Sequence, residues 1–186
     1  MGFLDNWSQT ALNSLPENYA TIFNDVAQVT YYKQNRTVFR KNDFGFEQIL
    51  TTYLANFFLR YLPAGYELGI AENLSNTTIE SKIQPDFSLS QPNRQIIEIM
   101  EIKTITNNKF SWFKRDILKL RGLTYLSNKY FLGISLYLTA RAKNQLPIHL
   151  QRFINQLNLN LINHGTIYQV NIQNHSFEFH YFLFQI

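Results

Sequence analysis

The sequence contains no cysteine, which excludes disulfides, thiol catalysis and cysteine-based zinc or iron–sulfur sites. No apolar run is long enough to cross a membrane as a helix, and the start of the chain lacks the basic and apolar segments of a secretory signal. With 7 Gly in the chain, there is no glycine-rich phosphate-binding loop, and no G-x-S-x-G elbow is present. These absences predict a cytoplasmic protein that is neither a nucleotide-binding enzyme nor an α/β-hydrolase.

The remaining composition is that of a globular protein. Apolar residues make up 45% of the 186 residues and charged residues 16%, which is enough core material for one folded domain. The 16 Phe and 11 Tyr favour a buried interior with strands. Because no repeat or long linker divides the chain, we predict a single domain over residues 1–186.

Apolar spacing and turn residues predict the order of the elements. Helical spacing continues from residue 3 to residue 29 with an interruption at Pro16, and a further helix begins after Asn42 or Asp43 and stops at 63–65. Then come strands at about 66–71, 83–89 and 95–106, a helix at 111–128, a central strand at 130–139, a helix from Pro147 to 163–165, and strands at 166–172 and 176–185. This order predicts an α/β fold in which helices flank a central mixed sheet, with N-terminal helices and a C-terminal β-hairpin.

Charge is distributed unevenly along the chain, although the net charge is only +4. Between residues 67 and 101 acidic residues predominate, whereas two basic stretches flank this segment. The basic residues that we expect to contact a nucleic-acid backbone are Arg36, Arg40, Lys41, Lys109, Lys114, Arg115, Lys119 and Arg121. An acidic centre between basic stretches suits a site that acts on a polyanion.

The isoleucine-rich strand at 95–106 carries charged residues in line with core positions. With a period of two, Glu101 and Lys103 share a face with Ile97 and Ile99, whereas Glu98 lies on the other face as a structural residue or a lysine's partner. A meander of the first three strands would bring Asp86 beside Glu101. Because adjacent carboxylates repel each other unless a cation lies between them, this pair indicates a site for Mg²⁺, which prefers oxygen ligands.

These residues resemble the signature of the PD-(D/E)xK, or restriction-endonuclease-like, nuclease superfamily. Pro85-Asp86 is followed after fourteen residues by Glu101-Ile102-Lys103, and the helix–strand–strand–strand–helix–strand order of that family is similar to residues 43–139. The resemblance implies a restriction-endonuclease-like core at 43–139, with residues 1–42 as a helical extension and 140–186 as a C-terminal helix and hairpin.

The same resemblance implies the roles of the site residues. Asp86, Glu101 and the carbonyl of Ile102 would bind Mg²⁺, with Mn²⁺ as a substitute, and Lys103 would orient and activate the attacking water. Glu47, in the first turn of the preceding helix, would hold a second metal ion or a metal-bound water.

The function that we expect is Mg²⁺-dependent endonucleolytic hydrolysis of double-stranded DNA with sequence specificity, as in restriction or homing enzymes. Two alternatives stay open: a structure-selective nuclease such as a Holliday-junction resolvase, and a non-catalytic nucleic-acid-binding module of the same fold. Because cutting both strands needs two active sites, we expect a homodimer or a higher homo-oligomer. No membrane partner is expected.

Overall fold

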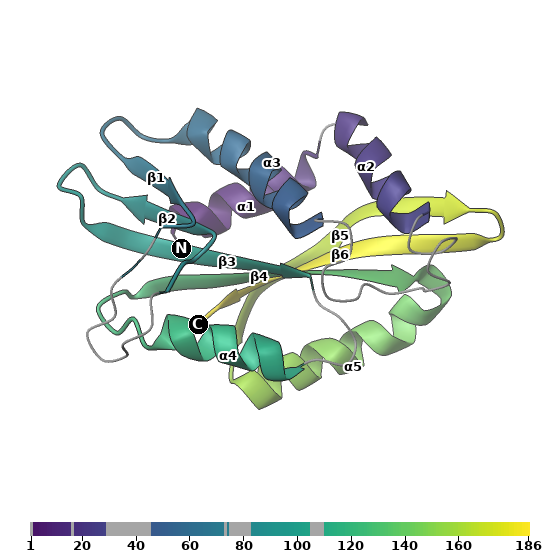
Figure 1. Cartoon of the computed structure of the whole chain (residues 1–186). Helices are drawn as coiled ribbons and strands as arrows, with labels where there is room; N and C mark the ends of the chain where they lie inside the picture. Colours follow the sequence, from purple (N-terminus) through teal and green to yellow (C-terminus); the bar gives the residue numbers. More distant parts are fainter. Residues whose placement is uncertain (1, 16, 29–45, 73, 75–82, 105–109) are drawn as a thin grey trace.

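The computed structural model describes residues 2–15, 17–28, 46–72, 74, 83–104 and 110–186 (Figure 1). The elements along the chain are α1 (Phe3–Asn13), α2 (Glu17–Gln28), α3 (Phe46–Tyr61), β1 (Glu67–Ile70), β2 (Phe87–Ser90), β3 (Ile96–Thr104), α4 (Phe110–Arg121), β4 (Asn128–Leu138), α5 (Thr139–Leu157), β5 (Asn160–Ile172) and β6 (His175–Gln185). The expected N-cap of α3, Asn42 or Asp43, lies outside the described residues.

The strands form one mixed sheet in the order β1-β2-β3-β4-β6-β5. β1, β2 and β3 are an antiparallel meander, as the sequence predicts, and β3 pairs with β4 in parallel. A parallel pair needs a crossover connection, and α4 lies within it. β6 pairs antiparallel with both β4 and β5 and therefore lies between them.

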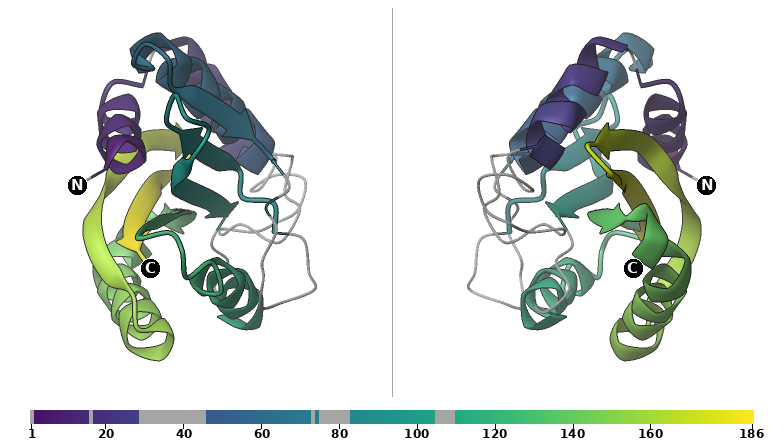
Figure 2. Two further views of the ribbon diagram at one scale, coloured as in Figure 1. Left: turned by 90° about the vertical axis from the view of Figure 1, so that its left-hand side faces the viewer. Right: turned by 90° about the vertical axis from the view of Figure 1, so that its right-hand side faces the viewer.

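Helices cover both faces of the sheet. α1, α2 and α3 lie on one face, and α4 and α5 lie on the other (Figures 1 and 2). The larger apolar cluster joins α1–α3 to the sheet through residues such as Leu4, Phe58 and Met100. Smaller clusters lie under α4 and α5, around Ile117 and Phe131 for example. The α/β fold with flanking helices is therefore confirmed.

β4 is a central strand, as its uninterrupted apolar run predicts. Every residue from Tyr130 to Tyr137 is buried, and hydrogen-bonded strands lie on both sides. No helix in the described part of the chain is both long and apolar enough to span a lipid bilayer.

The prediction that a helix begins at Pro147 and ends at 163–165 is wrong at both ends. α5 begins at Thr139, so Pro147 lies inside it, and the chain leaves the helix at Asn158, whose φ is 48°. Gly165, predicted as the helix stop, lies in β5 opposite Tyr181. A Cβ atom on this glycine would come within 2.9 Å of the Tyr181 ring, so close cross-strand packing explains the glycine.

Two further boundaries differ from the predictions. The helix predicted to reach residue 128 ends at Arg121, where the N–H of Gly122 donates to the carbonyls of Leu118 and Lys119 and a turn leads into β4. β2 begins at Phe87, so Pro85 and Asp86 come immediately before the strand rather than inside it. Proline has no N–H to donate to a ladder, which explains why the strand starts after it.

Glu98 connects the start of α1 to the middle of the sheet. Its carboxylate oxygens accept the N–H groups of Phe3 and Leu4 at 2.9 and 2.8 Å. The first N–H groups of a helix have no intrahelical partner and lie at the positive end of its dipole. The structural interpretation of Glu98 is therefore confirmed, with helix amides rather than a lysine as its partners.

Candidate active site

The end of β3 brings together the carboxylates that the sequence singles out. Phe87 pairs with Met100 and Ser88 with Ile99, so the same register places Asp86 opposite Glu101. The Asp86 Oδ2 atom accepts the N–H of Ile102 at 2.6 Å. This bond satisfies a β3 amide at the point where β2 has not yet begun, and it fixes the Asp86 side chain beside β3.

Lys103 lies between two glutamates from different elements. Its Nζ is 2.6 Å from Oε1 of Glu101 and 3.2 Å from Oε1 of Glu47. The second oxygen of Glu47 accepts the N–H of Thr104 at 3.1 Å. The first turn of α3 is thus attached to the last residues of β3, and all four predicted catalytic side chains converge there.

Burial, together with the charges of neighbouring carboxylates, raises the pKa of the two carboxyl groups opposite each other. Burial raises the pKa of Glu101 from 4.5 to about 7, with a further increase from the charge of Asp86 and a partial offset from Lys103. Burial likewise raises the pKa of Asp86 from 3.8 to about 6, and the hydrogen bond from Ile102 and the charge of Lys103 oppose it. The metal-free site therefore holds its negative charge at a cost in free energy.

The same carboxylates act in the opposite direction on the lysine. The charges of Glu101 and Glu47 raise the pKa of Lys103, although burial alone would lower it. Lys103 is therefore a cation at neutral pH. Its ammonium group is suited to orienting a water and to stabilising negative charge, and not to accepting a proton as a neutral amine would.

Asp116 on α4 is a fourth acidic residue near the site, and it is not among the site residues predicted from the sequence. Its charge raises the pKa of both Asp86 and Glu101. Its carboxylate is 3.8 Å from Nζ of Lys119, one turn further along the helix. The sequence does contain a sign of this position. Asp116 stands among basic residues and immediately precedes Ile117, which is buried, so it lies at the border of the helix face that packs on the sheet.

Asp86 and Glu101 have the donor chemistry that a divalent cation requires. Both are largely buried oxygen ligands whose ionised forms are disfavoured, and a cation between them would relieve that penalty. Within the described residues, no group of three or more His, Asp or Glu side chains is arranged closely enough to hold a metal. Any metal would therefore need the Asp86–Glu101 pair together with backbone or water oxygens, and both oxygens of Glu47 already have partners.

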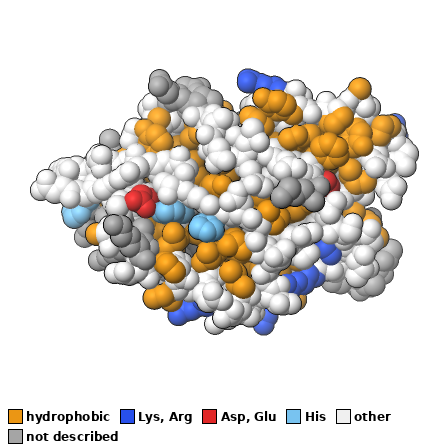
Figure 3. All heavy atoms as spheres, turned by 180° about the vertical axis from the view of Figure 1, so that it is seen from behind, with side chains coloured by type: hydrophobic (Ala, Val, Ile, Leu, Met, Phe, Trp, Pro, Cys, Tyr) orange, Lys and Arg blue, Asp and Glu red, His pale blue; other side chains and the backbone are white. Residues whose placement is uncertain are grey.

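The predicted nucleic-acid contacts have different environments. Lys114 and Arg115 are exposed on α4, whereas Lys119 is paired with Asp116. Arg121 donates to the carbonyls of Leu157 and Asn158 at 2.6 and 2.7 Å, so it connects α4 to the end of α5. Seen from behind, described Lys and Arg side chains lie mostly in the half of the molecule that holds α4 and α5 (Figure 3). Arg36, Arg40, Lys41 and Lys109 lie outside the described residues.

The fold and the site together define an α/β protein with an acidic, lysine-containing cluster at the end of a central strand. The chain is 44% identical over 195 aligned positions to Uncharacterized protein aq_aa32 of Aquifex aeolicus (strain VF5), an alignment that covers 99% of this chain and all of that protein. The chain belongs to the same protein family. No family model and no solved structure matches it significantly.

Proposed function

We propose that the protein is a metal-dependent endonuclease that hydrolyses phosphodiester bonds of double-stranded DNA with sequence specificity. The observation that supports this proposal most strongly is the convergence of Asp86, Glu101, Lys103 and Glu47 at the end of β3. A buried and a half-buried carboxylate, both with raised pKa values, cost the fold free energy where they stand beside a fixed ammonium group. Such perturbed groups concentrate at functional sites.

In this proposal, Asp86, Glu101 and the carbonyl of Ile102 hold Mg²⁺ or Mn²⁺. When bound, the cation would neutralise phosphate charge and make a water more acidic. The chain's own groups do the remaining work. Glu47 and Glu101 position Lys103, and its ammonium group orients the attacking water and stabilises the negative charge that develops on the phosphoryl oxygens.

The hydrolysis that we propose follows the superfamily resemblance. A bond forms between the water oxygen and phosphorus as the bond from phosphorus to the 3′ oxygen breaks. The attacking water gives up one proton to solvent and the leaving 3′ oxygen takes up one from solvent, so the products are a 5′-phosphate and a 3′-hydroxyl end. Lys114 and Arg115, exposed on α4, would contact the DNA backbone. Two antiparallel strands need two sites, so we propose that the active form is a homodimer or a higher homo-oligomer.

Cleavage assays test this function directly. Supercoiled plasmid and a four-way DNA junction are incubated with wild type, with Lys103→Ala and with Glu101→Gln, in Mg²⁺, Mn²⁺ or EDTA. We expect metal-dependent cutting that falls by on the order of 10²–10⁴ in both variants. Glu67→Gln, the same change at an exposed glutamate of β1, is the matched control and should cut like wild type.

The possible results separate the alternatives. Preference for plasmid with discrete products supports a sequence-specific enzyme, whereas preference for the junction supports a structure-selective nuclease. If wild type binds DNA but never cuts it, and Mg²⁺ leaves its stability unchanged, the non-catalytic binding module is correct and the proposed enzyme is not.

A further inference from the structure

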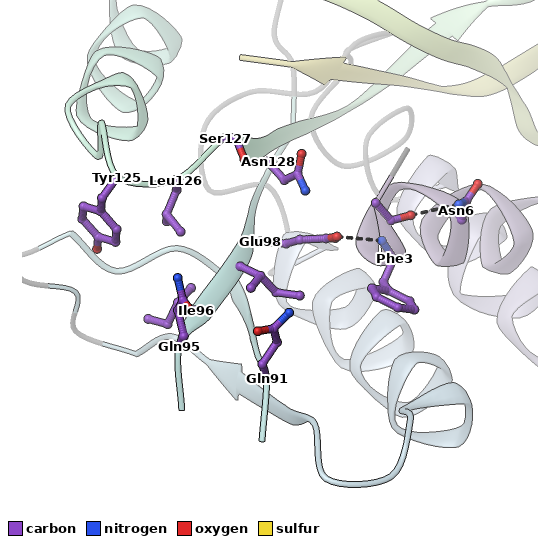
Figure 4. Close-up of a pocket in the computed structure, with 12 residues that line it drawn as sticks. Phe3, Asn6, Gln91, Gln95, Ile96, Glu98, Tyr125, Leu126, Ser127 and Asn128 are labelled. Atoms are coloured by element: carbon purple, nitrogen blue, oxygen red, sulfur yellow. Dashed lines mark hydrogen bonds between the residues drawn. The ribbon is translucent and has the colours of Figure 1, made fainter. Parts of the chain in front are cut away.

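A polar pocket lies at the other end of β3, away from the carboxylates. It has a volume of about 510 Å³, which is in the range of small-molecule sites. Four segments surround it: the start of α1, the β2–β3 turn, the first residues of β3, and the turn before β4 (Figure 4). Its lining residues are Gly2, Phe3, Asn6, Gln91, Gln95, Ile96, Ile97, Glu98, Tyr125, Leu126, Ser127 and Asn128.

The lining combines side-chain amides with apolar and aromatic surface. Gln91 and Gln95 come from the β2–β3 turn, and Asn128 lies across the pocket at the start of β4 (Figure 4). Phe3 and Tyr125 supply aromatic rings at opposite sides. Amide side chains offer both donors and acceptors in one plane, which is the pattern that reads the edge of a nucleobase.

The charge of the pocket selects against ionic ligands. None of the described residues that line it is Lys, Arg or His, so the described lining offers no cationic side chain to a phosphate. The acid, Glu98, is 2% exposed and already accepts two N–H groups of α1. Burial raises the pKa of Glu98, these two hydrogen bonds partly offset that rise, and its oxygens retain capacity to accept a further N–H.

We propose that this pocket binds a nucleobase. A nucleobase is neutral and flat, and it carries donors and acceptors on one edge, so it matches a lining that combines side-chain amides, two aromatic rings and isoleucines. Tyr125 is 56% exposed at the rim and offers a face for stacking. The choice of a nucleobase over another flat polar ligand also rests on the proposed nuclease function.

Glu98 in the pocket and Glu101 in the carboxylate pair project from opposite faces of β3, because their positions differ by three residues. Glu98 lines the pocket and Glu101 belongs to the carboxylate pair, so three residues of extended strand, about 10 Å, lie between them. A base in the pocket therefore need not belong to the nucleotide whose phosphate reacts, and binding at the pocket is tested separately from cleavage.

Nucleoside titration tests the pocket separately from catalysis. Adenosine, cytidine, guanosine and uridine are titrated into the full chain in EDTA by calorimetry, with glucose, ribose and inorganic phosphate as comparison ligands. We expect at least one nucleoside to bind and Tyr125→Ala to weaken it about tenfold, as loss of one stacking contact predicts. Tyr61→Ala, at an equally exposed tyrosine (56%) on α3, should bind like wild type.

A second pair of variants tests the amide contacts. Gln95→Ala should weaken nucleoside binding, whereas Gln48→Ala, at an exposed glutamine of α3, should not. Glu101→Gln should bind nucleosides as wild type does, so a failed nuclease proposal would leave this result intact. Absence of nucleoside binding, equal binding of glucose, ribose or phosphate, or equal affinities in Tyr125→Ala and Tyr61→Ala would each overturn the proposal.

Discussion

Replacing Glu101 with glutamine should stabilise the metal-free protein. One pKa unit corresponds to about 1.4 kcal/mol, so the rise from 4.5 to about 7 makes ionised Glu101 about 3 kcal/mol less favourable in the folded than in the unfolded chain. Glutamine has nearly the same shape without the charge. The desolvation and the repulsion from Asp86 therefore disappear, and Lys103 keeps Glu47 as its ion-pair partner.

The sign of the pH dependence follows from the direction of the pKa change. Because the folded-state pKa of Glu101 is raised, its favourable contribution is complete below pH 4.5 and is lost as the pH rises through about 7. In EDTA, wild type and Glu101→Gln should therefore have similar free energies of unfolding at pH 4.5. At pH 8 the variant should be more stable by up to about 3 kcal/mol.

Urea unfolding at pH 4.5 and pH 8, followed by circular dichroism, measures both values. Glu67→Gln, at an exposed position, controls for the loss of one negative charge and should not show the same gain. If Glu101→Gln is less stable than wild type at pH 8, then the ion pair with Lys103 outweighs burial and repulsion, and the electrostatic argument for a strained carboxylate pair is wrong.

Three further outcomes follow from described contacts. Glu98→Ala should lower the free energy of unfolding by about 3 kcal/mol, because two N–H groups of α1 lose a charged acceptor. Glu98→Gln should lower it by less. If wild type and Glu98→Ala were equally stable in urea unfolding, this reasoning would be contradicted. Gly165→Ala should lower the free energy of unfolding by about 1–3 kcal/mol in the same assay, because the added Cβ would press on the Tyr181 ring. An unchanged urea midpoint would refute the packing argument. Mg²⁺ at a hundred times its dissociation constant should raise the free energy of unfolding of wild type at pH 8 by about 2.7 kcal/mol, measured by thermal unfolding. The same addition should leave the stability of Asp86→Asn unchanged. If Mg²⁺ stabilised both proteins equally, the cation would bind elsewhere.

Local patterns predict most of the fold, and long-range contacts explain the errors. The apolar run of β4 and the isoleucine-rich run of β3 indicate their strands, because the middle of each strand is buried on both faces and burial on both faces leaves a direct trace in the sequence. The boundary at Gly165 is wrong because its glycine serves a contact with Tyr181, sixteen residues away, and not a helix end. A glycine has the same letter in both settings, so only the pairing of β5 with β6 distinguishes them.

The candidate site is predicted better than the surroundings that adjust it. The spacing of Asp86 and Glu101 suffices to place them opposite each other once a meander is assumed. Asp116 is not predicted as a site residue, because its effect on the pKa of Asp86 depends on how α4 packs against the sheet. The amide-lined pocket is also missed, because it collects residues from four distant segments and no local pattern connects them.

The position of β6 has a consequence for how the chain reaches its native state. Among the six strands that the structure describes, β6 comes last along the sequence, yet it lies inside the sheet between β4 and β5. During synthesis, the edges of β4 and β5 that pair with β6 therefore stay unpaired until residues 175–185 have been made. Exposed edges favour pairing with other chains, so slow translation or early termination should promote aggregation of this protein. The nascent protein would depend on chaperones until its final strand is inserted.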